Sequence, residues 1–396
     1  MSEKISIKQA VILAGGIGSR LKPLTDNLPK PMIPFHGRPF LEYLVQLLIE
    51  NGITEIILLL GYLPEKIIDH FGDGSKWGIK ISYSVGSVEE ETGTRIRNAA
   101  GLLAPHFLLM YCDNYWPLNL QKISDFYNER PVLATGVVYT NRDGFTQNNI
   151  MVDGEGFVVK YDKTRQDKSL NGVEIGFFIL DRKILEEMPP NNFSFEKEIF
   201  PKLIGKRELR GFMTDQRYYS VGKLERLPET EAFLKPKKVI CLDRDGVINK
   251  KAPEGDYVKS WAEFEFLPGA KEAVRLLTEK GYDIYIITNQ AGVARGMMSH
   301  NDLEEIHKNM QAELQMTGGK IKKIYACTHG WNEGCACRKP KPGMLFQIAK
   351  ENHVDLSKIF FIGDDDRDMQ AGKAAGSKTI LITPQKNLLA VVQNLV

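Results

Sequence analysis

Residues 239–249 read VICLDRDGVIN, a short apolar run followed at once by two carboxylates, Asp243 and Asp245, and a glycine turn. In an α/β protein this pattern marks the end of a buried strand, where reacting groups are presented. One carboxylate can attack phosphorus, the other can move a proton, and both can help to hold a divalent cation. Two acids after a strand are also common in solvated turns, so the pair alone is a weak signal.

Further polar residues of complementary chemistry follow later strand-like runs in the same segment. Thr288 and Asn289 offer a hydroxyl and an amide to phosphate oxygens, and Arg338 and Lys339 supply positive charge. Asp364 opens a second acidic cluster, GDDDRD, which is suited to completing an oxygen-ligand Mg²⁺ site. Together these strand-end groups favour a reaction centre over solvated turns, and we expect Asn289 and Arg338 to contact the substrate.

This constellation resembles the haloacid dehalogenase superfamily of phosphatases over nearly all of residues 237–396. DRDGVIN, TNQAGVARG and CRKPKPGM are similar to a small-capped branch that contains heptose bisphosphate and histidinol phosphate phosphatases. In those relatives a basic residue usually follows the metal-binding Asp, whereas this chain has Asp365, so that phosphate contact is not carried over. The resemblance implies that Asp243 is the nucleophile and Asp245 the general acid/base. It also implies that Thr288 binds phosphate, that Lys339 is the motif lysine, and that Asp364 binds Mg²⁺ together with the two motif acids.

A second motif has the spacing C-x-H-x5-C-x-C. Three thiols and one imidazole suit a tetrahedral structural zinc site, with each close pair holding one side of the ion. The alternative is chance clustering of buried cysteines, but three of the five cysteines lie in this short stretch. The same loop binds zinc in the phosphatases that the segment resembles. We therefore expect structural Zn²⁺ bound by Cys327, His329, Cys335 and Cys337.

The composition of the whole chain favours a globular protein with small phosphorylated ligands. With 52 basic and 50 acidic residues, the net charge of +2 gives no broad footprint for nucleic acid or anionic membrane. The most apolar run, 45–60, contains Glu50 and Glu55, so no transmembrane helix is expected. Thiols grouped as metal ligands, with Cys112 and Cys241 at strand ends, indicate a reducing, cytoplasmic compartment. An oligomer is compatible with all of these features.

Strand-like runs alternate with helical patterns along the 396 residues, which predicts an α/β fold built as two consecutive Rossmann-like three-layer domains. A helical pattern ends near Leu234, and Pro236 interrupts the chain just before the strand at 239–242. We therefore expect one domain over residues 1–234 and a second over residues 237–396.

The first domain begins with a glycine-rich loop, LAGGIGSRL, directly after the first strand-like run. Its glycines let the backbone approach a polyphosphate and expose amide donors, while Arg20 adds a charged fork. The loop lacks the third glycine of the dinucleotide fingerprint, and no Walker lysine follows. A hydride-transfer cofactor site and a P-loop are therefore not supported.

The stretches GGIGSRLKPLT and PKPMIP closely resemble the signature of sugar-1-phosphate nucleotidyltransferases, a resemblance that covers residues 1–234. It implies a nucleotidyltransferase fold here, ahead of a haloacid dehalogenase-like fold with a minimal cap and a zinc loop. Nucleoside triphosphate is expected to bind the loop through Gly15, Gly16, Gly18, Ser19 and Arg20, with Lys30 of PKPMIP near its phosphates. Mg²⁺ is expected at Asp113. The sugar phosphate is expected near Asp162, Lys163 and Glu174.

Two features of the first domain leave alternatives open. Asp162 and Glu174 can also be read as solvated surface acids. Relatives usually place a second metal-binding Asp where this chain has Ser220, and a hydroxyl is a poor replacement for a carboxylate. Either Asp113 and the substrate phosphates hold the metal alone, or the domain is slow or partly degenerate.

The expected transfer needs no protein base. A sugar phosphate is largely dianionic near neutral pH, since its second pKa is about 6, so its oxygen can attack the α-phosphorus directly. The protein needs to align the reactants and neutralise charge, which amides, Arg20, Lys30, Lys163 and Mg²⁺ at Asp113 would do.

The combination of the two domains resembles the bacterial route to GDP-D-glycero-D-manno-heptose. There a phosphatase removes the 7-phosphate of heptose 1,7-bisphosphate, and a transferase joins heptose 1-phosphate to the guanylyl group of GTP. The alternatives are the same folds acting on another sugar phosphate and nucleotide, or a histidinol phosphate-like phosphatase fused to a sugar-nucleotide sensor. The residues do not identify the base or the sugar, because specificity is expected in weakly marked loops such as 91–98.

Overall fold

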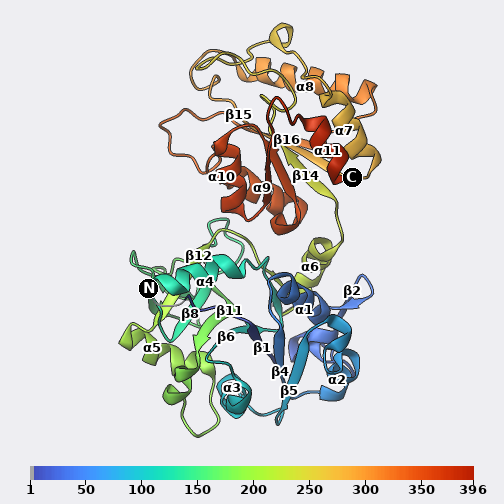
Figure 1. The fold of residues 1–396 in the computed structure, drawn as a ribbon. Coiled ribbons are helices and arrows are strands. Elements are labelled where there is room, and N and C mark those ends of the chain that lie inside the picture. Colours follow the sequence, from blue (N-terminus) through green and yellow to red (C-terminus); the bar gives the residue numbers. More distant parts are fainter. Residues whose placement is uncertain (1–3) are drawn as a thin grey trace. The chain divides into compact units, whose positions relative to one another are not determined.

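The computed structural model describes residues 4–396, and this part of the chain folds as two compact units that divide between Leu234 and Lys235. Each unit contains an open sheet with helices on both faces (Figure 1). The prediction of two consecutive three-layer α/β folds is confirmed. Across residues 4–396, no helix is both long and apolar enough to cross a membrane.

The first sheet has a parallel centre. β1 pairs in parallel with both β4 and β6, whereas β11 runs antiparallel to its two neighbours. Central parallel strands are covered on both faces and need continuous apolar sequence, and QAVILA of β1 is buried throughout. The order of its strands in the described residues is β12 (Leu209–Thr214), β8 (Ala134–Tyr139), β11 (Val173–Asp181), β6 (His106–Tyr111), β1 (Gln9–Ala14), β4 (Glu55–Leu60) and β5 (Lys80–Val85).

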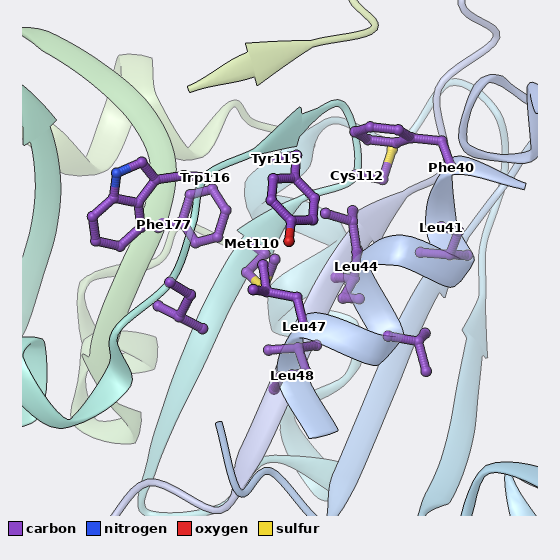
Figure 2. Packing of buried hydrophobic residues seen from close by; sticks show 14 of the residues in the cluster. Phe40, Leu41, Leu44, Leu47, Leu48, Met110, Cys112, Tyr115, Trp116 and Phe177 are labelled. Atoms are coloured by element: carbon purple, nitrogen blue, oxygen red, sulfur yellow. The ribbon is translucent and has the colours of Figure 1, made fainter. Parts of the chain in front are cut away.

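Alternate side chains of the central strands decide which helices cover each face of this sheet. Ala10 and Ile12 belong to one core and Val11 and Leu13 to the other. Figure 2 shows the first core, where leucines of α1 lie beside Met110 of β6. The first face carries α1 (Phe40–Glu50), α2 (Pro64–Phe71), α4 (Leu120–Glu129) and α6 (Leu227–Leu234), and the second carries α3 (Thr92–Asn98) and α5 (Phe200–Lys206).

Residues 92–98 form the helix α3 instead of the expected loop. Threonine and glycine have low helix propensity, so the local sequence does not favour a helix here. Tertiary hydrogen bonds overcome this preference: the Gly93 and Thr94 N–H groups donate to the carbonyl of Phe193 at 3.1 and 3.3 Å. The Phe193 N–H donates in return to Oγ1 of Thr94 at 3.0 Å. The start of the helix is thus fixed by a segment that is distant in sequence.

The second sheet is entirely parallel in the described residues, and its middle strand carries the first acidic motif. Its order is β16 (Lys323–Cys327), β15 (Asp283–Asn289), β14 (Val239–Leu242), β17 (Phe360–Gly363) and β18 (Lys378–Leu381). One face is covered by α7 (Ala270–Glu279), α8 (His300–Met316) and α11 (Leu388–Leu395), and the other by α9 (Gly343–Asn352) and α10 (Asp366–Ala375). Because the strands are parallel, the carboxyl ends of β14, β15 and β17 meet at one edge.

Candidate active sites

The glycine-rich loop after β1 packs against a buried arginine of α3. A Cβ atom on Gly15 would lie 2.3 Å from Cζ of Arg95, so a side chain does not fit there. Arg95 is 5% exposed and donates to the carbonyls of Leu60 and Ser87, both at 2.6 Å. This arginine therefore connects the loop backbone to the end of β4 and to the segment that follows β5.

The remaining loop residues are exposed or partly exposed. Gly18 has a φ of 71° and caps the short turn Ser19–Leu21, while a Cβ atom on Gly16 would meet nothing within 4 Å. Gly16, Ser19 and Arg20 are exposed. Exposed backbone and a nearby guanidinium can hold phosphate oxygens.

Lys30 and Asp113 form an ion pair beside this loop. Lys30 Nζ lies 2.7 Å from Asp113 Oδ2, and both side chains are largely buried. Burial opposes ionisation of Asp113, but the ammonium group of Lys30 outweighs it and holds the pKa of Asp113 below its usual value. Asp113 is therefore an ionised carboxylate, which is the form that a Mg²⁺ ligand requires.

Ser220 lies beside Asp113. The short strands β7 (Asn114–Tyr115) and β13 (Tyr219–Ser220) pair antiparallel, with Ser220 opposite the residue after Asp113. A Cβ atom on Gly222 would lie 3.2 Å from Ser220 Oγ, 3.6 Å from Asp113 Oδ2 and 3.9 Å from Arg20 Nη2. A hydroxyl, a carboxylate and a guanidinium thus surround the same space.

The three residues expected near the sugar phosphate have different surroundings. Asp162 closes its own turn by accepting the N–H groups of Thr164 and Gln166 at 2.8 and 3.1 Å. These hydrogen bonds, led by that of the Thr164 side chain, lower the pKa of Asp162 to about 2. Lys163 is exposed. Glu174 in β11 is different, because burial raises its pKa to about 7, and the negative charge of Asp113 adds to this effect.

In the second domain, Lys339 bridges two carboxylates at the end of the sheet. Its Nζ lies 2.8 Å from Asp243 Oδ1 and 2.6 Å from Asp368 Oδ1, and it also donates to the carbonyl of Ile287 at 3.0 Å. Lys339 is 4% exposed, so these contacts fix its position. Burial raises the pKa of Asp243 above its ordinary value in spite of the Lys339 charge, and the charge of Asp368 contributes.

The acidic groups fit a divalent cation. One carboxylate oxygen each from Asp243, Asp364 and Asp368 lies within 4.8 Å of the others. Asp364 Oδ1 is buried and has no hydrogen-bond partner. Buried charged oxygens need a compensating partner, and clustered carboxylates with an unpartnered oxygen suit Mg²⁺.

Asp245 lies outside this cluster. Its oxygens accept from the guanidinium of Arg244 at 3.0 Å, from Asn249 Nδ2 at 2.9 Å and from Gln290 Nε2 at 2.6 Å. Arg244 is fully buried, and its Nη1 also contacts Nε2 of His307 in α8 at 3.0 Å. The side chain of Asp245 is therefore held by neighbouring donors, next to the cluster of three carboxylates.

A cavity of about 580 Å³ opens in front of Asp243 and is also lined by Thr288, Asn289 and Arg338. Thr288 Oγ1 accepts from Gln290 Nε2 at 2.8 Å. Asn289 is tied to the backbone of the motif lysine, donating to its carbonyl and accepting from its N–H. Arg338 has a buried Nη1 without a partner, so it retains a donor for an anionic ligand.

The cysteine and histidine side chains converge as the motif predicts. Cys337 Sγ lies 3.3 Å from Cys327 Sγ, 3.5 Å from Cys335 Sγ and 3.2 Å from His329 Nδ1. A tetrahedral zinc with Zn–S bonds of about 2.3 Å needs neighbouring sulfurs about 3.8 Å apart. The four ligand atoms lie within 4.8 Å of one another and fit such an ion with small adjustments.

Sequence reasoning missed Asp368, Arg244, His307 and Arg95. Asp368 could have been found, because it is the last acid of the GDDDRD cluster that begins with Asp364. The pairings of Arg244 with His307 and of Arg95 with the glycine loop join residues far apart in the chain, and no local pattern marks them.

Comparison with known proteins agrees with this description. Residues 9–237 match the family model described as nucleotidyl transferase, and residues 336–389 match one described as HAD-hydrolase-like. The chain belongs to the nucleotidyl transferase family through its first domain and to the haloacid dehalogenase-like hydrolases through its second. The prediction of an enzyme that joins a nucleotidyltransferase to a phosphatase is confirmed.

Its relatives include D-glycero-beta-D-manno-heptose-1,7-bisphosphate 7-phosphatases. The one from Pseudomonas putida is 39% identical over 38% of this chain and 84% of the relative. The one from Bordetella bronchiseptica is 42% identical over 37% of this chain and 80% of the relative. The structure is also similar to HddC from Yersinia pseudotuberculosis, with a TM-score of 0.50 and 27% identity over 58% of this chain and 100% of that one.

Proposed function

We propose that the chain catalyses two consecutive steps in the synthesis of a nucleotide-activated heptose. Residues 237–396 would remove the 7-phosphate of D-glycero-D-manno-heptose 1,7-bisphosphate. Residues 1–234 would then transfer a guanylyl group from GTP to heptose 1-phosphate and release pyrophosphate. The observation that carries the proposal is the union in one chain of a nucleotidyl transferase domain with the likeness to heptose bisphosphate phosphatases, because the product of one reaction is the substrate of the other.

In the phosphatase reaction, Asp243 would attack the phosphorus while the bond to the sugar oxygen breaks. Asp245 would donate a proton to that oxygen and then take one from the water that hydrolyses the aspartyl phosphate. Lys339 holds Asp243 in place, and Thr288, Asn289 and Arg338 line the cavity where the substrate would bind. Mg²⁺ held by Asp243 and Asp364 would neutralise phosphate charge, and the sequence motif adds Asp245 to this group.

In the transferase reaction, the anomeric phosphate would displace pyrophosphate from the α-phosphorus. The backbone of Gly15, Gly16 and Gly18, with Ser19, would bind the triphosphate, and Arg20 and Lys30 would stabilise the negative charge that develops. Mg²⁺ at Asp113 would supply further charge neutralisation.

Around the sugar phosphate, Lys163, Asp162 and Glu174 would provide the binding groups. Glu174 is the best supported of the three, because it is buried and lies within electrostatic range of Asp113. Zinc bound by the Cys/His group would be structural. Reduced thiols favour a cytoplasmic location, and the oligomeric state is left to experiment.

The test crosses the heptose bisphosphate with each nucleoside triphosphate in the presence of Mg²⁺. With GTP we expect one equivalent of inorganic phosphate, followed by GDP-heptose and pyrophosphate. Loss of the 1-phosphate, or a strong preference for another triphosphate, would contradict the heptose and guanylyl assignments. Phosphate release without pyrophosphate release from any triphosphate would favour the sensor alternative that Ser220 motivates.

A further inference from the structure

Lys251 forms an ion pair with the candidate metal ligand that Lys339 does not contact. Its Nζ lies 2.6 Å from Asp364 Oδ2, and the next nearest carboxylate is that of Asp365 at 3.9 Å. The close approach depends on Gly246, because a Cβ atom there would lie 2.0 Å from Asp364 Oδ2 and 2.7 Å from Lys251 Cε. Gly246 has a φ of 88°, which also favours glycine at this turn.

The two lysines of the metal-binding group differ in their freedom to move. The side chain of Lys339 is 4% exposed and is held by two carboxylates and a carbonyl. The side chain of Lys251 is 43% exposed and ends a flexible four-carbon chain. A cation that binds at this position can therefore displace Lys251 and leave Lys339 in place.

Charge balance favours this exchange. When Asp243, Asp364 and Asp368 are all ionised, they face the ammonium groups of Lys339 and Lys251 with one net negative charge. A divalent cation in place of Lys251 makes the group neutral, whereas a divalent cation together with Lys251 makes it positive. Like charges a few ångströms apart repel, so the bound ion and the lysine cannot both remain against Asp364 at low cost.

Once displaced, Lys251 stays at the mouth of the substrate cavity. Lys251 lines that cavity together with Arg338 and Arg367. Arg367 is occupied by a two-pronged contact with Asp365, with distances of 2.9 and 2.8 Å. A freed Lys251 is then a surplus positive charge facing the space where a second anionic group of the substrate would lie.

We propose that Lys251 is a displaceable counter-ion, which neutralises Asp364 until Mg²⁺ binds and then binds the second phosphate of a doubly phosphorylated sugar. The second half of this role rests on the proposed phosphatase substrate. The first half concerns metal binding alone and does not depend on that substrate.

The metal-binding test compares Lys251→Gln with Lys250→Gln. Lys250 is the adjacent lysine, pairs with Glu265 and does not line the cavity. Both changes are made in the Asp113→Ala background, so that the first domain does not contribute to a Mg²⁺ titration by calorimetry. We expect Lys251→Gln to tighten Mg²⁺ about threefold, a magnitude typical of a partly exposed ion pair, and Lys250→Gln to match its parent. Unchanged or weaker Mg²⁺ binding in Lys251→Gln would overturn the counter-ion role.

The substrate test uses the same two changes in the otherwise unaltered chain. Lys251→Gln should raise KM for the heptose bisphosphate about tenfold at saturating Mg²⁺, equivalent to about 1.4 kcal/mol, and should raise KM for phenyl phosphate, which has no second phosphate, much less. Lys251→Arg should restore much of the affinity. Equal effects on both substrates would overturn the phosphate-binding role. If the parent itself did not hydrolyse the bisphosphate, the proposed function would fail, and the Mg²⁺ titration would still decide the counter-ion role.

Discussion

Lys30 Nζ lies 2.7 Å from Asp113 Oδ2, so the lysine of the PKPMIP segment and the candidate metal ligand of the first domain form one charged unit. The N–H of Val221 donates to the Asp113 carbonyl at 2.8 Å, which ties the same unit to the strand that carries Ser220. Under the proposed function, Mg²⁺ binding at Asp113 would free Lys30 to stabilise the negative charge of the transferred group.

Lys30→Met should reduce kcat/KM for nucleotidyl transfer by about two to three orders of magnitude, the usual loss for one charge-stabilising group. The control is Lys80→Met on the edge strand β5, where the ammonium pairs with Glu55 away from this site. Pyrophosphate release measures both variants. A parental rate in Lys30→Met would exclude the lysine from the reaction.

Ser220→Asp tests the missing carboxylate. Ser220 Oγ and Asp113 Oδ2 both border the space in front of Gly222, so a new acid would be close enough to share a cation with Asp113. We expect the Mg²⁺ concentration for half-maximal transfer to fall. Ser220→Asn is the matched control, because it adds similar volume without charge. If the Mg²⁺ titration is the same in the parent and both variants, Ser220 does not occupy a ligand position.

The Cys/His group should hold one tightly bound Zn²⁺ per chain. Cys335→Ser should lose the metal and lower the melting temperature of the second domain, because binding energy at a closed site is also folding energy. Asn332→Ala, an exposed change in the same loop, should keep both metal and stability. Metal analysis of protein purified without chelators is the measurement, and a zinc-free protein with full phosphatase activity would contradict the assignment.

Glu174 should make the first domain less stable at alkaline pH. Its pKa is raised from 4.5 to about 7 by burial, so the folded state favours the neutral acid. The stabilisation is complete below the unfolded pKa and is lost as the pH rises through about 7. Glu174→Gln should therefore unfold at a higher temperature than the parent at pH 8, by an energy of about 1–3 kcal/mol, and at a similar temperature near pH 4.5. Scanning calorimetry of the whole chain at both pH values measures this, and a pH-independent difference would exclude the ionisation of Glu174 as its cause.

The strand-end chemistry could be predicted because parallel strands bring the ends of distant segments together. Asp243 and Asp364 follow β14 and β17, which are neighbours in the sheet, and their carboxylates approach each other. The sequence does not indicate how each side chain turns. Asp245 faces Arg244, whose guanidinium also contacts His307 of α8. Such orientation depends on packing between elements, which local patterns do not encode.

In the first domain too, packing between elements decides features that the local sequence does not indicate. Glycine at the loop after β1 could be read as room for a polyphosphate, yet Gly15 also makes room for the buried guanidinium of Arg95. The segment 91–98, which carries this arginine, was expected to be a weakly marked loop, and its threonines and glycine are poor helix formers. Its conformation depends on tertiary hydrogen bonds, among them those with Phe193 and Phe195.

The two activities should be separable by single changes. Asp243→Asn removes the nucleophilic oxygen, and a loss of several orders of magnitude in phosphate release is expected, at about 1.4 kcal/mol per order. Transfer from supplied heptose 1-phosphate should stay within about twofold, because Asp243 and Asp113 belong to different compact units. Asp113→Ala should strongly reduce nucleotidyl transfer and leave phosphate release near the parental rate.

Mixing the two variants provides the final control. With heptose 1,7-bisphosphate and GTP, neither variant alone should form GDP-heptose, whereas the mixture should, since heptose 1-phosphate released by one chain can diffuse to the other. Chromatography of the nucleotide sugar measures the outcome. Product formed by Asp243→Asn alone would remove Asp243 from the nucleophile role. A mixture that stays inactive, although each variant keeps its other activity, would mean that the phosphatase does not release the transferase substrate.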